Sequence, residues 1–192
     1  MPTPRILVFA GSVRKDSFNR RLAKLAADAA RAAGAEVTHI ELADYQLPLM
    51  NEDLQVEHGV PKEAQALKKL FVEHDGLILS CPEYNSGITP LLKNVIDWVS
   101  RKEGSEPPLV AYRGKVAGLM SASPSPFGGI RGLVQVRSIL GNIGVLVLPD
   151  QVQVPKAQEA FQPDGTLKDA ALAARVTALA HSVVTTAGKL KN

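Results

Sequence analysis

The sequence has little cysteine, no long apolar run and no strong excess of charge. Cys81 is the single cysteine among 192 residues, so no intrachain disulfide can form, and a reducing cytosol suits such a chain. No apolar run approaches the roughly 20 residues that a membrane helix needs. The first residues lead directly into a short apolar run, which is not the layout of a signal peptide. We therefore expect a cytoplasmic protein with no signal peptide and no membrane association.

Several familiar functional motifs are also absent. Without GxxxxGKS or GxxxxGKT a P-loop nucleotide hydrolase is disfavoured, and without GxGxxG after the first apolar run so is a standard dinucleotide-binding fold. No GxSxG supports a hydrolase triad. The four histidines show neither HExxH nor HxxxH spacing, so no metal site is expected. The net charge of +3 comes without a lysine run or basic stripe, so nucleic acid is not an expected partner.

What the chain does contain is a regular alternation of apolar runs and helical patterns. Hydrophobic residues make up 45% of the sequence and charged residues 21%, which is ordinary for a globular protein, and we expect one domain over residues 1–192. Periodicity predicts strands at 6–10, 36–42, 76–81, 116–120 and 145–148. It predicts helices from Leu22 to the Gly34 stop and at 62–74, 91–101, 130–140 and 167–189, with 45–61 and 102–114 as loop and linker.

This alternation predicts an α/β fold, a doubly wound parallel sheet of five strands with helices on both faces. At this chain length we expect the strand order 2-1-3-4-5. In such sheets the ligand site lies at the carboxyl ends of the first and third strands, where the winding reverses. The loops that follow those two strands should therefore carry the functional residues.

The loop after the first strand, residues 11–19, reads GSVRKDSFN. It ends at a helix N-terminus, where free backbone N–H groups and a partial positive charge favour an anion. Ser12, Ser17 and Asn19 add small polar groups and Arg14 adds a cation, a set that suits a phosphate dianion. The alternative is a Ser/Asn-capped helix of an ordinary α/β protein, with Arg14 in solvent.

The loop after the third strand, residues 82–90, reads PEYNSGITP. Pro82, Glu83, Tyr84 and Asn85 place an aromatic ring and polar groups beside the expected phosphate loop. Backbone groups of such a loop can meet the edge of a flat heterocycle. A rigid turn between prolines, with a purely structural role, remains the alternative.

Three stretches together resemble the NAD(P)H-dependent FMN reductase family of the flavodoxin-like superfamily, which includes chromate, quinone and azo-dye reductases. They are GSVRKDSFNRRLA at 11–23, PEYNSGITPLLKNVIDWVSR at 82–101 and SPSPFGGIRGLVQVRSIL at 123–140. The resemblance covers most of the chain and implies a flavodoxin-like fold. One departure is that Gly87 stands where many members carry a hydroxyl residue, and Pro90 comes one residue later than usual.

The resemblance also implies a cofactor site. Ser12, Arg14, Ser17 and Asn19 would bind the FMN phosphate. Residues 82–85 (Pro82, Glu83, Tyr84 and Asn85) would line the flavin ring, largely through backbone groups. Ser123 and the Gly128–Gly129 turn would close the other side of the ring.

The implied activity is oxidation of NAD(P)H through FMN, with electrons passed to a small-molecule acceptor: free flavin, a quinone, an azo dye or a metal oxyanion. A homodimer or homotetramer is implied, with the Tyr84 loop and the 91–101 helix near the interface. The competing interpretation is a non-enzymatic electron carrier of flavodoxin type. Such carriers tend to be acidic, and the pI near 9.0 argues against it.

Some residues remain open between a functional and a structural role. Cys81 ends the third strand beside the expected site, but a buried cysteine behaves more often as a small hydrophobe. Arg101, Arg131 and Arg137 could meet a dinucleotide phosphate, and solvated helix faces explain them equally well. No residue is predicted to be an acid–base catalyst, because flavin chemistry needs none from the protein.

Overall fold

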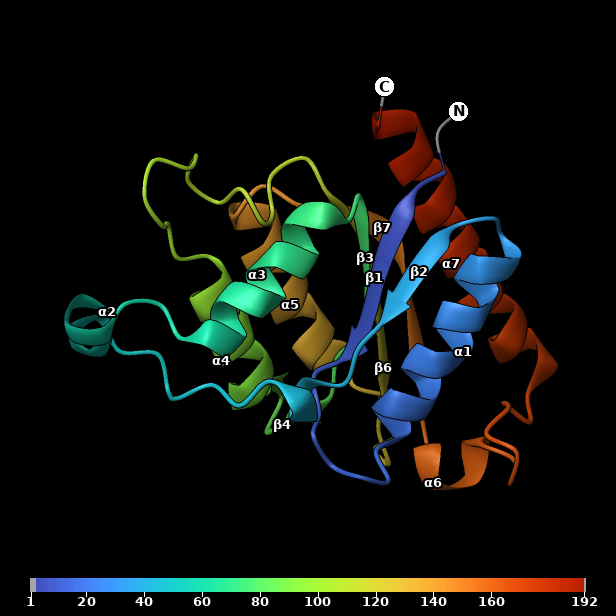
Figure 1. Ribbon diagram of the computed structural model, residues 1–192. Coiled ribbons are helices and arrows are strands. Elements are labelled where there is room, and N and C mark those ends of the chain that lie inside the picture. Colours follow the sequence, from blue (N-terminus) through green and yellow to red (C-terminus); the bar gives the residue numbers. More distant parts are fainter. Residues whose placement is uncertain (1–2, 192) are drawn as a thin grey trace.

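A computed structural model describes residues 3–191 and shows one five-stranded parallel sheet covered by helices on both faces (Figure 1). The strand order is β2-β1-β3-β6-β7, which confirms the predicted order 2-1-3-4-5. The sheet strands are β1 (Arg5–Ala10), β2 (Glu36–His39), β3 (Gly76–Ser80), β6 (Val116–Ala122) and β7 (Leu146–Val154). The larger helices are α1 (Phe18–Ala32), α3 (Lys62–Glu73), α4 (Pro90–Val99), α5 (Ile130–Asn142) and α7 (Ala170–Leu190).

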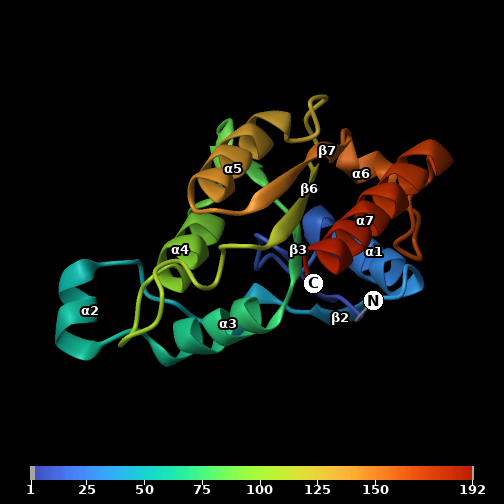
Figure 2. The same cartoon turned by 90° about the horizontal axis from the view of Figure 1, so that it is seen from above.

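The two faces of the sheet bury separate halves of the core. Along β1, Ile6 and Val8 pack in the cluster that holds α1 and α7, whereas Leu7 and Phe9 pack in the cluster that holds α3, α4 and α5. This alternation is the period-two pattern of a strand covered on both sides. Figure 2 shows the same layers from above. The arrangement brings the carboxyl ends of β1, β3 and β6 to one edge.

The structure differs from the sequence-based expectation in the segment predicted as a loop at 45–61. That segment includes a short helix, α2 (Glu52–His58), which follows the 3₁₀ turn η1 (Leu42–Asp44). Asn51 caps α2 by accepting a hydrogen bond from the Asp53 N–H, and Gly59 ends it with a positive φ of 78°. No residue of α2 is buried, and the helix projects from the body in Figure 1. Because its apolar residues lack helical spacing, periodicity alone missed it.

Two further differences concern the end of the chain. The fifth strand was expected at 145–148, but β7 continues to Val154 after an irregularity in its pairing with β6. The last helix begins at Ala170, not at 167, because Leu167 pairs with Phe161 in a small bridge and Asp169 caps the helix. A four-residue helix, α6 (Ala157–Ala160), lies between β7 and this bridge.

α7 is 21 residues long with a hydropathy of 1.2, so by length and composition alone it could cross a membrane. In the structure, its buried side packs in the same core cluster as α1 and β1, with Val176, Leu179 and Val183 at its centre. This packing accounts for its apolar composition. The expectations of one domain and of no membrane association stay predictions.

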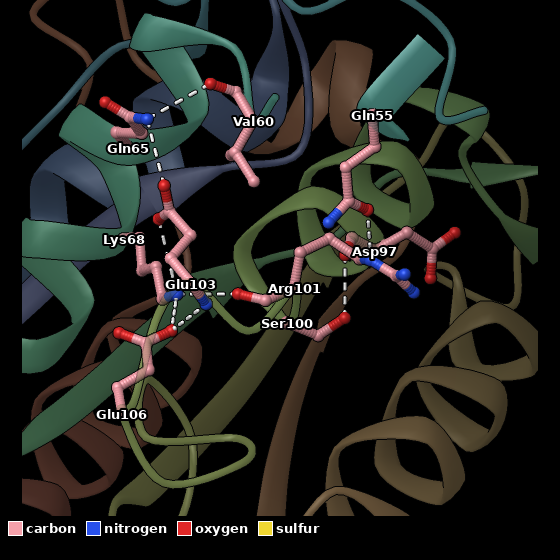
Figure 3. A network of polar contacts seen from close by, with 9 residues as sticks. All are labelled: Gln55, Val60, Gln65, Lys68, Asp97, Ser100, Arg101, Glu103 and Glu106. Carbon is pink, nitrogen blue, oxygen red and sulfur yellow. Dashed lines mark hydrogen bonds and ion pairs between the residues drawn. The ribbon is translucent and has the colours of Figure 1, made fainter. Parts of the chain in front are cut away.

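A polar network holds the 101–106 segment and α2 in place (Figure 3). The buried Lys68 donates from Nζ to the Arg101 carbonyl at 2.6 Å and pairs with Glu103 and Glu106. Arg101 itself donates to Gln55 on α2 at 2.6 Å. The predicted linker is therefore attached to α3 through Glu103 and Glu106, and Arg101, just before it, contacts α2.

Candidate functional site

A cavity of about 300 Å³ lies at the carboxyl edge of the sheet. It brings together segments that follow β1, β3 and β6, as the predicted topology requires. Most of the predicted site residues line it, namely Ser12, Arg14, Ser17, Asn19, Pro82, Glu83, Tyr84 and Ser123, whereas Asn85 and the Gly128–Gly129 turn do not. Phe18, Ala122 and Pro124 complete the lining.

The N-terminus of α1 opens on this cavity without a side-chain cap. Ser17 occupies the cap position and is 3% exposed, yet its side chain makes no capping hydrogen bond and the first turn carries no acidic residue. Among the described residues, nothing accepts from the N–H groups of Phe18, Asn19 or Arg20. Thr89 caps α4 and Asp169 caps α7 through their side chains, whereas α3 and α5, like α1, have an N-cap residue that makes no such bond. Free N–H groups at a helix N-terminus form an anion site.

Arg14 supplies a cation at the same end of the cavity. Its guanidinium carbon lies 5.4 Å from the centroid of the Phe18 ring, and that of Arg21 lies 5.9 Å away. Phe161 stacks on Phe18 with ring centroids 6.1 Å apart. These contacts hold Phe18 as an aromatic support for both arginines, of which Arg14 alone lines the cavity.

Asn19 has a structural role that the sequence did not suggest. Its Nδ2 donates to the Ala122 carbonyl at 2.8 Å, and its Oδ1 accepts from the Ala122 N–H and the Ser80 hydroxyl, both at 2.9 Å. The side chain thus ties the start of α1 to the ends of β3 and β6. One Nδ2 hydrogen remains to donate to an anion. The role of Asn19 as a phosphate ligand stays a prediction, and its side chain can donate at most one hydrogen bond there.

The segment after β3 folds as a small hairpin of β4 (Glu83–Tyr84) and β5 (Gly87–Ile88). Asn85 and Ser86 form its two-residue turn with φ values of 51° and 65°, the backbone sign of a type I′ turn. This explains why Asn85 does not line the cavity: it supplies the turn. Tyr84 is 58% exposed at the cavity wall.

Thr89 stands at the end of this hairpin, where the sequence departs from the pattern described above, and it has a structural role. Its hydroxyl donates to the Gly11 carbonyl at 3.1 Å and accepts from the Leu92 N–H as the cap of α4. It therefore connects the hairpin segment to the loop after β1. Gly87 leaves the adjacent space to the Gln135 side chain, which a Cβ at Gly87 would approach at 3.2 Å.

Glu83 and Gln135 attach the hairpin to α5. The Glu83 carboxylate accepts from the Gly132 N–H at 2.8 Å, within the first turn of the helix. Gln135 accepts from the Ile88 N–H and donates to the Ser86 carbonyl, both at 3.2 Å. Sequence reasoning missed Gln135 and the Glu83 contact, because residues 49 positions apart give no local signal.

The segment after β6 forms the third wall. The Ser123 hydroxyl accepts from the Ser125 N–H at 3.2 Å, while the Ser123 N–H donates to the Val154 carbonyl. Gly129 has a φ of 84°, and a Cβ there would lie 2.0 Å from the Ser121 hydroxyl oxygen. A glycine is therefore required where this segment enters α5.

The structure shows the surroundings of the four residues that the sequence left open between a functional and a structural role. Cys81 is 1% exposed in the core cluster that also holds Leu92 and Leu119, and burial raises the pKa of its thiol, so it behaves as a hydrophobe. Arg137 donates to the Val147 and Pro149 carbonyls and supports the irregular part of β7. Arg101 is engaged with α2, and Arg131 stacks on Phe127 at 4.5 Å.

The model of the NADPH-dependent FMN reductase family matches residues 4–159. This chain belongs to that family. An NAD(P)H:quinone oxidoreductase of Solanum tuberosum is 33% identical over 199 residues, covering 99% of this chain and 96% of that protein. An NAD(P)H-dependent FMN reductase of Pseudomonas aeruginosa is 34% identical over 167 residues, covering 86% of this chain and 85% of its own length.

The solved structures agree with this assignment. The flavoenzyme NAD(P)H:(acceptor) oxidoreductase FerB of Paracoccus denitrificans superposes with a TM-score of 0.79 and 26% identity, over 97% of this chain and 98% of that one. The reductase is thus an FMN enzyme that uses NAD(P)H, as predicted, and the enzyme interpretation is favoured over the electron carrier. The open α1 N-terminus is an observation of this chain that fits the phosphate of FMN.

Proposed function

We propose that the reductase holds the FMN phosphate on the free N–H groups of α1, Ser12, Ser17 and Arg14, and the flavin ring between the β4–β5 hairpin and residues 123–129. NAD(P)H is oxidised there and the electrons pass to a small-molecule acceptor. Quinones come first among the acceptor classes because two relatives that cover most of the chain bear that name. Free flavins, azo dyes and metal oxyanions follow.

The observation that carries this proposal is the uncapped start of α1. Ser17 fills the cap position of α1, but it is buried and its side chain does not cap the helix. The first N–H groups of α1 therefore remain as donors directed at the cavity. An anion with several acceptor oxygens satisfies them together, and Arg14 adds a charge-assisted bond. The flavin phosphate is the group of this size and charge that the family's cofactor provides.

FMN, when bound, accepts hydride and releases electrons to the acceptor. The chain's own residues bind and orient. In the cavity lining, the carboxylate of Glu83 is engaged with the Gly132 N–H, and the lining holds no histidine. This composition suits a site that positions a cofactor rather than one that transfers protons.

The decisive experiment is an NAD(P)H oxidation assay on dialysed protein, titrated with FMN, across a panel of acceptors. We expect turnover that saturates with FMN and requires an acceptor, with quinones among the best. A protein that binds FMN but oxidises NAD(P)H only when a separate reductase is added would be an electron carrier. If adding FMN changed neither the absorbance spectrum nor the thermal stability of the protein, the proposed FMN site would be wrong.

We also propose a homodimer or homotetramer in the cytoplasm, in contact with neither nucleic acid nor membrane. The support for assembly is a set of large apolar side chains left in solvent: Val134 on α5 is 61% exposed and Val56 on α2 is 88% exposed. The hairpin residue Tyr84 is exposed near α5. Light scattering across a dilution series measures the assembly, and a monomer at every concentration would contradict it.

A further inference from the structure

The wall of the cavity formed by the hairpin is attached to α5 at two points that use different chemistry. The first is charged: the Glu83 carboxylate accepts from the Gly132 N–H at 2.8 Å. The second is neutral: Gln135 exchanges two hydrogen bonds with the Ser86 and Ile88 backbone at 3.2 Å each. The two contacts sit on successive turns of one helix face, so the hairpin cannot shift along α5 without losing both.

Close packing between the same elements reinforces these bonds. A Cβ at Gly132 would lie 3.2 Å from the Gly87 carbonyl oxygen and 3.3 Å from the Glu83 Cβ, so a glycine allows the backbones to approach. Gly129, the N-cap of α5, ends the segment whose first residues, Ser123 and Pro124, line another wall of the cavity. One helix end therefore sets the spacing of two walls.

The charge of Glu83 also matters at this position. The N-terminus of a helix carries a partial positive charge, which the carboxylate compensates. The cation of Arg131 in the same turn is directed onto the Phe127 ring at 4.5 Å. The carboxylate thus offsets a positive helix end beside the cavity that Glu83 lines.

We propose that Glu83 and Gln135 are positioning residues for the flavin ring, and that the Glu83 carboxylate, by compensating the α5 N-terminus, lowers the reduction potential of the bound flavin. The proposal rests on the proposed function, since it takes FMN to occupy this cavity. Gln135 governs geometry alone, whereas Glu83 governs geometry and charge. The two residues therefore have different expected signatures.

Glu83→Gln tests the charge. The amide keeps the shape and an acceptor oxygen for the Gly132 N–H, but it removes a negative charge that disfavours the electron-rich reduced flavin. We expect affinity for reduced FMN relative to oxidised FMN to rise about tenfold, which for a two-electron couple is an upward shift of roughly 30 mV. Affinity for oxidised FMN should change less than about threefold. A potential equal to that of the wild type would overturn the charge role.

Gln135→Ala tests the geometry. It leaves every charge in place and lies on an exposed helix face, so the variant should fold. We expect FMN and riboflavin to bind about three- to tenfold more weakly by the same factor, because the ring wall moves while the phosphate site does not. The reduction potential should stay as in the wild type. Unchanged riboflavin affinity would overturn the positioning role.

Gln65→Ala is the matched control. Gln65 is also an exposed helical glutamine, on α3, with side-chain bonds to Val60 and Glu103, and it does not line the cavity. It should alter neither flavin affinity nor potential. A cofactor-free readout is amide exchange: Glu83→Ala should speed exchange of the Gly132 N–H, and unchanged exchange would contradict the contact. If the wild-type protein bound no FMN, the proposed function would fail. If the wild type bound FMN but the variants matched it in affinity and potential, only the proposed roles of Glu83 and Gln135 would be refuted.

Discussion

Arg14 and Arg21 lie over the same aromatic ring but differ in their relation to the cavity. Both guanidinium groups are within 6 Å of the Phe18 centroid, and Arg14 alone lines the cavity. Side-chain packing is therefore similar for the two, while contact with an anion is expected of one. Comparing variants of the two arginines therefore distinguishes a side chain that binds the phosphate from one that only stacks on Phe18.

Arg14→Ala should weaken FMN binding about 10- to 100-fold, because a hydrogen bond to a charged group contributes roughly 1.5–3 kcal/mol. Riboflavin, which lacks the phosphate, should bind the variant and the wild type alike. Arg21→Ala is the control and should leave FMN affinity near that of the wild type. Fluorescence titration measures all of these affinities. Equal losses for FMN and riboflavin would show that Arg14 supports the ring and not the phosphate.

Cys81 is predicted to be dispensable for electron transfer. Its thiol is 1% exposed and its pKa is raised by burial, so little thiolate forms in the folded protein. Cys81→Ala should retain most of the turnover and cost about 1 kcal/mol of stability through lost packing. In the wild type, a thiol reagent should react only as fast as the protein unfolds. Rapid modification of the folded enzyme, or a loss of flavin reduction at full FMN occupancy, would contradict this.

At the scale of secondary-structure elements, sequence periodicity could predict the features that depend on the local sequence pattern. The five sheet strands, their order and the two loops that carry the site follow from buried runs alternating with helices. Contacts between distant segments could not be predicted. Asn19 bonds to Ala122 across 103 positions, and its use there reduces what it can offer a ligand. The β4–β5 hairpin escaped notice because its strands have two residues each, too few to show a period.

The segment after α4 depends on Lys68, whose buried ammonium meets the Arg101 carbonyl and two carboxylates. Lys68→Met keeps the packing volume but removes the ammonium from all three acceptors, although Glu103 keeps its bond from Gln65 and Glu106 its bond from the Glu103 N–H. The carboxylates are partly exposed, so we expect a loss of about 1–3 kcal/mol in the free energy of unfolding. Urea denaturation measures it. Adding Glu106→Gln to Lys68→Met should recover part of the loss, and a strictly additive double variant would contradict the coupling.

The same network gives a pH dependence. Burial raises the pKa of Glu106, but hydrogen bonds from the Lys68 ammonium and the Glu103 N–H outweigh it and hold this pKa below its usual range. A lowered pKa in the folded state stabilises the protein above the unfolded value of about 4.3, and the gain is lost as pH falls through the folded value. Lys68→Met should flatten this acid-side decline in stability. A decline as steep as that of the wild type would assign it to other groups.

At the scale of the whole molecule, three walls from distant parts of the chain meet at one edge of one sheet. The start of α1, the β4–β5 hairpin and residues 122–124 line the cavity, and the Glu83–Gly132 hydrogen bond joins the hairpin to α5. Under the proposed function, both substrates of the reaction must reach the cofactor bound in this cavity.

This shared access predicts the kinetic mechanism. A cavity of about 300 Å³ is at the small end for ligand pockets, so the flavin ring of the proposed complex would fill much of it. Nicotinamide must come within about 3–3.5 Å of the ring to react, and a quinone must approach the same exposed surface. The two substrates should therefore exclude each other, so that flavin reduction and reoxidation alternate.

We accordingly expect ping-pong kinetics at saturating FMN, with parallel lines in double-reciprocal plots of NAD(P)H against acceptor. High acceptor concentrations should inhibit competitively against NAD(P)H. Under anaerobic conditions without acceptor, NADPH should bleach the visible absorbance of the bound flavin at a rate at least equal to turnover. Intersecting lines, or bleaching that requires the acceptor, would mean that both substrates bind together, and a site with room for both would have to extend beyond the cavity at the sheet edge.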